Sequence, residues 1–123
     1  MKRVHPVWAG LVGKDCEDQM KSDDVAPLVS IVIPMRNEED YIQDCLESIF
    51  ASTYPPNRLE VIVADGRSGD DSCRLVMALQ QQHPNLRLVD NPGKVTPVGL
   101  NVGIREAKGS VVVIFGAHAV LGK

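Results

Sequence analysis

Four short apolar runs follow one another along the chain from residue 28 onward. The first, 28–33, is rich in β-branched side chains and stops at Pro34, which is typical of a parallel strand buried on both faces. The runs 59–64 and 111–115 have the same character, whereas 86–89 alternates apolar and polar residues as an edge strand does. The pattern therefore predicts four strands.

Segments with helical spacing of their apolar residues separate these runs. The first begins at Asn37, a candidate N-cap, and the second begins near Ser68 or Asp70. The third begins at Thr96 and closes at Gly109. The order β-α-β-α-β-α-β predicts an α/β fold, a Rossmann-like parallel sheet with right-handed crossovers and strand order 3-2-1-4.

Length and composition limit the organisation and the partners. The 123 residues suffice for one domain with a core; we expect 1–27 to be a loosely ordered tail and 28–123 the domain. The formal charge of −3 and the scattered basic residues exclude nucleic acid as the expected partner. No apolar run approaches the roughly 18 residues that a membrane-spanning helix needs.

Cys16, Cys45 and Cys73 lack C-x-x-C spacing, which favours free thiols in a reducing compartment.

Polar segments follow the end of each predicted strand, at 34–38, 65–70, 90–94 and 116–118. In open parallel sheets, ligands bind outside the carboxyl ends of the strands, so we expect these segments to form one site. No G-x-G-x-x-G follows the first strand, and Gly93-Lys94 lacks the rest of a phosphate-binding loop. Dinucleotide-binding and P-loop sites are therefore excluded.

Several motifs occur in a fixed order along the domain. They are V-S-I-V-I-P at 29–34, N-E at 37–38 and V-I-V-A-D-G-x-S-x-D at 61–70. This series resembles the opening of family 2 glycosyltransferases with the GT-A fold. A second group of motifs is similar to those of the succinoglycan-type exopolysaccharide branch. It consists of D-N-P at 90–92 and of L-N-x-G-I and A-x-G within 100–109. The resemblance covers the chain from residue 28 almost to its end, as the N-terminal half of such a domain.

The resemblance implies a site for a nucleoside-diphosphate sugar. Asp65 would accept a hydrogen bond from the base, Lys94 would reach the diphosphate, and Asn101 would meet the ligand or a loop. The remaining members of this expected site are Pro34, Arg36, Asn37, Glu38 and Asp70.

Structural alternatives remain open for most of these residues. Asp65 also suits a turn before Gly66, and Asp70 suits a cap of the second helix. Glu38 also suits the first turn of a helix, and Lys94 a solvated loop. Asn101 also suits a plain helix surface, but it lies beside the apolar stripe of its helix, where a polar side chain wants a partner.

The fourth polar segment departs from the family pattern. Relatives have an acidic residue where this chain has Gly116, followed by Ala117 and His118. In complete relatives that residue helps to hold a divalent metal, Mg²⁺ or Mn²⁺, which neutralises the leaving diphosphate. Glycine supplies no side-chain ligand. His118 is a candidate metal ligand or, alternatively, a loop histidine bonded to backbone.

We therefore expect the nucleotide-sugar-binding half of an inverting-type glycosyltransferase of polysaccharide or glycolipid synthesis. The half with the acceptor site and the catalytic base would follow it, so no catalytic residue is assigned, and this stretch alone is not expected to complete transfer. The resemblance implies a cytoplasmic location at the inner membrane face. The edge of the run 111–115 would need the tail, a partner chain or the missing half to cover it.

Two other classes of protein stay open. The first is a non-catalytic nucleotide- or partner-binding remnant, indicated by Gly116 and by the early end of the motif series. The second is a phospho-acceptor signalling domain, because Asp65 ends a strand, although the acidic pair expected after the first strand of such a domain is missing.

Overall fold

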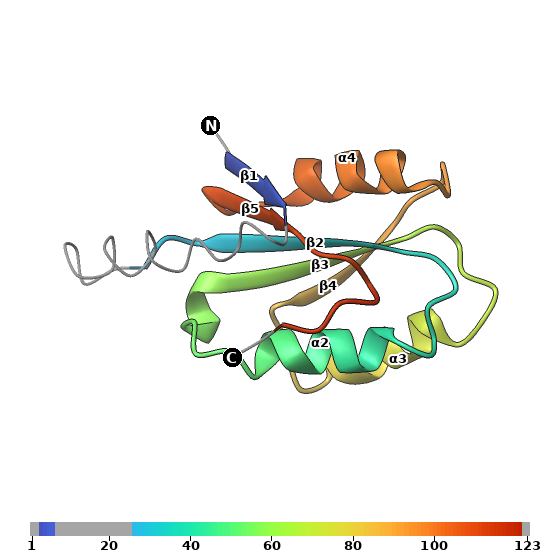
Figure 1. The fold of residues 1–123 in the computed structure, drawn as a ribbon, viewed down its shortest axis with the longest axis horizontal. Helices are drawn as coiled ribbons and strands as arrows, with labels where there is room; N and C mark the ends of the chain where they lie inside the picture. The colour runs from blue at the N-terminus through green and yellow to red at the C-terminus, as the bar shows by residue number, and fades with distance from the viewer. Residues whose placement is uncertain (1–2, 7–25, 122–123) are drawn as a thin grey trace.

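The computed structural model describes residues 3–6 and 26–121. These residues form one parallel sheet in the order β1-β5-β2-β3-β4 (Figure 1). Its strands are β1 Arg3–Pro6, β2 Val29–Met35, β3 Leu59–Asp65, β4 Leu86–Asp90 and β5 Val111–Ile114. The order of the last four strands confirms the predicted Rossmann-like α/β fold and its arrangement 3-2-1-4.

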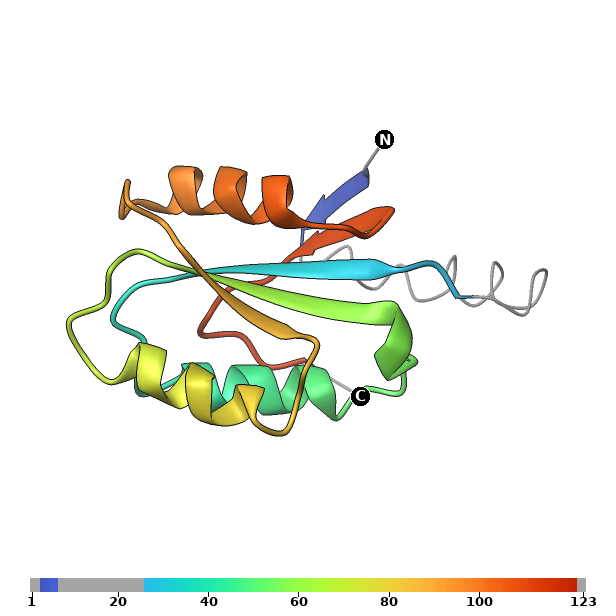
Figure 2. The ribbon, with the colours of Figure 1, turned by 180° about the vertical axis from the view of Figure 1, so that it is seen from behind.

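Helices cover both faces of the sheet, as Figures 1 and 2 show. The helical segments are α2 Ile42–Phe50, η2 Pro56–Arg58, α3 Ser72–Gln80 and α4 Thr96–Glu106. Helix α4 packs alone on one face, against β2 and β3, while α2 and α3 lie together on the other face. No helix in the described part of the chain combines the length and apolarity needed to cross a bilayer.

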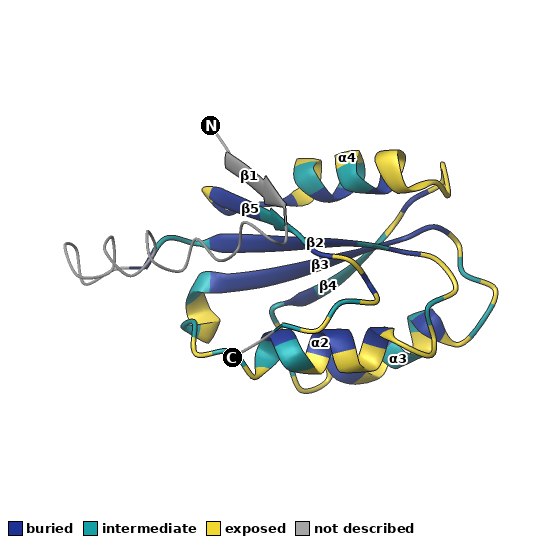
Figure 3. Ribbon diagram, viewed as in Figure 1, coloured by how far each residue is buried: buried dark blue, intermediate teal, exposed yellow. Residues whose placement is uncertain are grey.

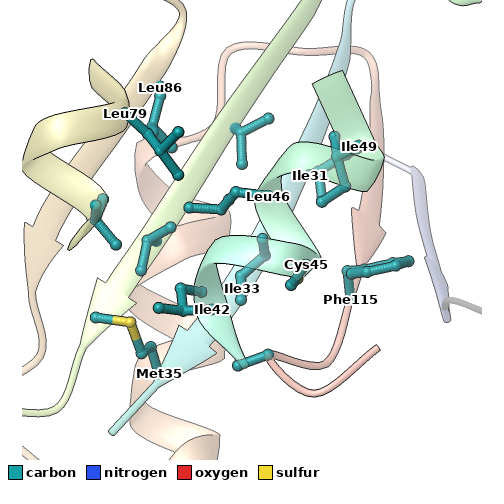
Figure 4. Close-up of a cluster of buried hydrophobic side chains, with 14 of the residues drawn as sticks. Ile31, Ile33, Met35, Ile42, Cys45, Leu46, Ile49, Leu79, Leu86 and Phe115 are labelled. Carbon is teal, nitrogen blue, oxygen red and sulfur yellow. The ribbon is translucent and has the colours of Figure 1, made fainter. Parts of the chain in front are cut away.

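The larger core lies between the sheet and the pair α2 and α3. Strand β3 is buried along its whole length and β2 is buried at all but one position (Figure 3). Ile33, Ile42 and Leu46 are fully buried in this layer (Figure 4). Burial on both faces explains why these strands are continuous apolar runs in the sequence.

Helix α4 lies very close to the sheet because small residues face it. A Cβ added at Gly103 would lie 2.2 Å from Cγ1 of Val32, and one at Gly99 would lie 3.3 Å from Cβ of Pro34. Beyond the helix, a Cβ added at Gly109 would lie 2.6 Å from Oγ of Ser30. The expectation that Gly109 closes the helix was wrong, since α4 ends at Glu106. Gly109 is instead needed where the chain passes β2.

Strand β1 corrects part of the predicted tail. Residues 3–6 pair in parallel with β5, from Arg3 opposite Val111 to Pro6 opposite Ile114. Residues 3–6 therefore form a strand rather than part of a loose tail. Of the other residues predicted as tail, 1–2 and 7–25 lie outside the described residues, and Ala26 is buried. The tail itself provides the neighbour that the edge of β5 was expected to need.

A buried polar network ties the segment after α4 to the start of the strands. Oε2 of Glu60 accepts hydrogen bonds from Oγ of Ser30 at 2.5 Å and from the backbone N–H of Lys108 at 2.5 Å. Nη1 of Arg87 lies 3.5 Å from Oε1 of Glu60. Ser30 and Glu60 lie near the amino ends of β2 and β3, so this network is at the opposite end of the sheet from the predicted site.

Candidate functional site

The carboxyl ends of β2, β3 and β4 lie side by side. Met35 is opposite Asp65, and Asp65 is opposite Asp90. Val32 is opposite Ile114, so β5 ends at the same edge. The structure therefore brings the four polar segments to one edge of the sheet, where the loops gather at the right of Figure 1. We call this edge the carboxyl edge.

Three loops at the carboxyl edge contain an unusual backbone conformation. The described non-glycine residues with positive φ are Asn37 at 54°, Arg67 at 60° and Lys94 at 67°. They follow β2, β3 and β4 respectively. Such conformations cost of the order of 1–3 kcal/mol and persist only where surrounding contacts fix them, commonly at binding sites.

Ser68 joins the loop after β2 to the loop after β3. Its hydroxyl donates to Oδ1 of Asp65 at 2.6 Å and accepts from the backbone N–H of Asn37 at 2.9 Å. Oδ1 of Asn37 accepts from the backbone N–H of Gly69 at 2.7 Å. The predicted capping role of Asn37 was wrong: α2 begins at Ile42, and Asn37 bonds across to the neighbouring loop instead.

Ser72 repeats this arrangement one residue further along the first loop. Its hydroxyl donates to Oδ1 of Asp70 at 2.5 Å and accepts from the backbone N–H of Glu38 at 2.8 Å. Asp70 also accepts from the backbone N–H groups of Ser72 at 2.9 Å and Glu39 at 3.3 Å. Desolvation raises the pKa of Asp70, but the hydrogen bonds from Ser72 and Glu39 outweigh it and leave the pKa below its ordinary value. These contacts support the alternative that Asp70 organises the start of α3.

Asp65 is buried against α3 and is already partly satisfied. It is 8% exposed and also accepts from the backbone N–H of Ser68, 3.2 Å from Oδ1. Burial, a hydrogen bond to Asp65 and the charges of Asp65 and Asp70 raise the pKa of the Cys73 thiol to about 12. A protonated Cys73 therefore donates to Asp65 at neutral pH. A carboxylate offers about four acceptor positions, so Asp65 can take a further donor.

Glu38 and His118 join the loop after β2 to the loop after β5. Nε2 of His118 lies 2.9 Å from Oε2 of Glu38, and the Tyr41 ring meets the imidazole edge-on at 4.9 Å. Cys45 lies buried nearby; its thiol donates to the carbonyl of Gly116 at 3.6 Å, and burial and the Glu38 charge raise its pKa to about 12. The free-thiol prediction holds for Cys45 and Cys73, whereas Cys16 lies outside the described residues.

The residues present do not fit a divalent-metal site. Among residues 3–6 and 26–121, no three His, Cys, Asp or Glu side chains are grouped so that they could hold a metal ion. Gly116 offers no side-chain ligand, and the imidazole of His118 is paired with Glu38 rather than with backbone. Two such groups are a poor set for Mg²⁺, which prefers oxygen ligands in octahedral geometry.

The other predicted site residues take different positions. Pro34 is half-buried beneath the start of α4, where a Cβ added at Gly99 would lie 3.3 Å from it. Arg36 and Lys94 are exposed in loops of the carboxyl edge, and a Cβ at Gly66 would lie 2.8 Å from the carbonyl oxygen of Lys94. Asn101 is exposed on α4, so it does not need the partner that its position beside the apolar stripe suggested.

Sequence reasoning missed the joining roles of Ser68, Ser72 and Cys73. The signal was present in the spacing, since Ser68 and Ser72 follow Asp65 and Asp70 within the reach of side-chain turns. The contacts of both hydroxyls with residues 37 and 38 are long-range, and the sequence alone does not reveal them.

The family can now be identified. The model of "Glycosyl transferase family 2" matches residues 30–123. The chain belongs to this family, which removes the phospho-acceptor domain from consideration. As expected, the fold is the N-terminal part of a GT-A glycosyltransferase domain.

Two relatives and one solved structure place the chain within the family. The chain is 39% identical over 93 residues to "Dolichyl N-acetyl-alpha-D-glucosaminyl phosphate 3-beta-D-2,3-diacetamido-2,3-dideoxy-beta-D-glucuronosyltransferase" of Methanococcus voltae, covering 74% of this chain and 29% of that protein. It is 32% identical over 88 residues to "Succinoglycan biosynthesis protein ExoA" of Rhizobium meliloti, covering 71% and 26%. The mannosyltransferase PcManGT of Pyrobaculum calidifontis, solved with GDP-Man and Mn²⁺, has a TM-score of 0.74 at 29% identity and covers 95% of this chain and 39% of that one.

The chain therefore spans well under half the length of these relatives. The exopolysaccharide relative is one of several glycosyltransferases that match, so the family is shown and the succinoglycan-type branch is not singled out.

Proposed function

We propose that this chain binds the nucleoside-diphosphate sugar in a glycosyltransferase that transfers the sugar to an acceptor hydroxyl. The observation that carries this proposal is the interlocked carboxyl edge, where Ser68 and Ser72 tie the loop after β2 to the loop after β3. Ligands bind at this edge in open parallel sheets. Loops fixed in advance lower the entropic cost of binding.

The residues of the carboxyl edge divide naturally between base and diphosphate. Asp65, with acceptor capacity left over, suits an N–H group on a base. Asn37 is joined to Asp65 through Ser68, whereas Pro34 lies at the end of the neighbouring strand on the face covered by α4. The exposed cations Arg36 and Lys94 suit the diphosphate. Glu38 and Asp70 hold the loops in place, since Glu38 pairs with His118 and Asp70 accepts a hydrogen bond from Ser72.

The reaction in the whole enzyme is a displacement at the anomeric carbon. The acceptor oxygen forms a bond to that carbon, the bond to the diphosphate oxygen breaks, and the nucleoside diphosphate leaves with the electron pair. A general base takes the proton of the acceptor hydroxyl. The part supplied by this chain is to bind and orient the donor.

The acceptor is proposed from the relatives. The name of the Methanococcus voltae protein gives a dolichyl phosphate-linked sugar as its acceptor, which supports a lipid-linked glycan acceptor here. A lipid-linked acceptor would place the reaction at a membrane surface, on the cytoplasmic face that the resemblance implied. The match to ExoA supports the finer proposal of succinoglycan-type exopolysaccharide synthesis.

A second candidate function is a nucleotide- or partner-binding protein without transferase activity. Gly116 in place of the acidic ligand favours it, together with the pairing of His118 with Glu38. In its nucleotide-binding form this candidate uses the same site, and sugar transfer by the whole protein distinguishes the two candidates.

Replacement of Asp65 tests the proposed site. Asp65→Ala should weaken the binding of UDP or GDP by about 1–3 kcal/mol, because a hydrogen bond to a charged acceptor is lost. Isothermal titration calorimetry measures the change. Asp71→Ala is the matched control: Asp71 is exposed in the same loop and pairs with Arg74, so affinity should stay unchanged. Equal affinities of Asp65→Ala and the unmodified chain would remove Asp65 from the site.

A further inference from the structure

The hydroxyl of Ser68 has one proton, and the geometry shows where it goes. The contact with the backbone N–H of Asn37, at 2.9 Å, requires Ser68 to accept. The hydroxyl proton is therefore directed to Oδ1 of Asp65, 2.6 Å away. Ser68 thus fixes the rotation of the Asp65 carboxylate from within the loop.

The two oxygens of Asp65 are unequally occupied as a result. Oδ1 receives the hydroxyl of Ser68, and the backbone N–H of Ser68 lies 3.2 Å from Oδ1 and 3.3 Å from Oδ2. The thiol of Cys73 adds a weak donor to the same carboxylate. Oδ1 is held by a short hydrogen bond, whereas Oδ2 can still accept a hydrogen bond from a stronger donor.

We propose that Ser68 is a positioning residue which, by holding Oδ1 of Asp65, presents the other oxygen to a base and makes the site select bases with a ring N–H. The inference rests on the proposed function. Uracil and guanine have such an N–H group, and a carboxylate is its natural acceptor. Without Ser68 the Asp65 carboxylate could rotate, and fixing it when the base binds would cost free energy. That cost would reduce the advantage of a base that donates an N–H over one that does not.

The second serine provides an internal comparison. Both oxygens of Asp70 are occupied, Oδ1 by Ser72 and Oδ2 by the backbone N–H of Glu39. Ser72 is fully buried and supports the backbone at Glu38. Loss of Ser72 should therefore loosen the loops without changing the preference for one base edge over another.

Base selectivity separates the two roles. The probes are UDP and GDP, each compared with its analogue methylated at the ring nitrogen, N3 of uracil or N1 of guanine. Dissociation constants are measured by calorimetry for the unmodified chain, Ser68→Ala, Ser68→Thr and Ser72→Ala, with thermal melting of each variant to verify folding. The ratio of the two dissociation constants is the readout, because a general loss of structure weakens both ligands alike.

We expect the unmodified chain to prefer the unmethylated ligand by about tenfold, the value of one hydrogen bond to a charged group. Ser68→Ala should lower the ratio, because Asp65 loses the contact that fixes its rotation, and Ser68→Thr, which keeps the hydroxyl, should restore it. Ser72→Ala should weaken both ligands and keep the ratio. An unchanged ratio in Ser68→Ala, or no preference in the unmodified chain, would overturn the inference and leave the proposed function standing. Binding of neither nucleotide by the unmodified chain would overturn the proposed function itself.

Discussion

The acidic side chains of the carboxyl edge differ in how far their oxygens are already used. Asp70 is satisfied by three donors from its own surroundings, and Glu38 is paired with His118. Asp65 is the only one of the three that is buried, and its Oδ2 is approached by the backbone N–H of Ser68 at 3.3 Å while Oδ1 receives the Ser68 hydroxyl at 2.6 Å. Partial satisfaction of a buried carboxylate is a reason to place a ligand contact there, since buried acceptors tend to be fully bonded.

At the same scale, Gly116 offers a direct test of the missing metal ligand. An added Cβ would meet no described atom within 4 Å, and no described glycine has a positive φ, so Asp fits without strain. In the presence of UDP or GDP, Gly116→Asp should raise Mn²⁺ affinity about tenfold, because a carboxylate returns beside His118. Titration with Mn²⁺ followed by electron paramagnetic resonance measures it.

Gly116→Asn is the control, since it has the same size without the charge. It should leave Mn²⁺ affinity close to that of the unmodified chain. An equal gain in both variants, or in neither, would show that the charge at position 116 does not govern metal binding.

At the scale of elements, the buried strands were predictable and the loop-dependent features were not. Strands β2 and β3 are apolar throughout because both faces are covered, so their sequences carry the signal. Helix α2 begins later than predicted because Asn37 bonds across to Gly69, a contact between distant residues. Strand β1 was missed because Arg-Val-His-Pro is too short and mixed to show a period.

The same reasoning applies to the site. The sequence placed the polar segments at one edge of the sheet, because the ends of parallel strands must meet there. It did not show that Ser68 and Ser72 hold this edge together, since that depends on the spacing between two loops. The position of Asn101 beside the apolar stripe also predicted a partner for its side chain, but Asn101 is exposed on α4.

The close packing of α4 gives a prediction for this element. Gly103→Ala would place its Cβ 2.2 Å from Cγ1 of Val32, a stiff and fully buried side chain. Overpacking of this kind costs about 1–3 kcal/mol, against a gain of about 1 kcal/mol for alanine in a helix. We expect a net loss of about 1 kcal/mol in the free energy of unfolding, measured by urea denaturation.

Two variants verify the cause of that loss. Gly116→Ala, where the added Cβ meets no described atom within 4 Å, should change the stability little. In a Val32→Ala background the penalty of Gly103→Ala should disappear, because the overlapping methyl group is gone. A penalty that persists there would mean that the helix backbone, and not Val32, limits the approach.

At the scale of the whole molecule, β1 determines which strand forms the edge of the sheet. Strand β5 is an apolar parallel strand, and residues 3–6 pair along its length. An apolar edge strand without a neighbour invites pairing with another chain. Deletion of residues 1–6 should therefore convert the protein to oligomers, measured by size-exclusion chromatography with light scattering. An unchanged mass would show that another segment covers β5.

The two ends of the sheet give the central claim its most direct test. The carboxyl edge has the interlocked loops, and the opposite end has the network of Glu60, Ser30 and Arg87. Titration of the isotopically labelled chain with UDP and with GDP, followed by amide chemical shifts, reports where the nucleotide binds. We predict the largest shifts at Asn37, in the loop 65–70 and at Lys94, with Glu60 and Arg87 unchanged. Shifts centred on Glu60 and Arg87, or no shifts with either nucleotide, would contradict a nucleotide site at the carboxyl edge.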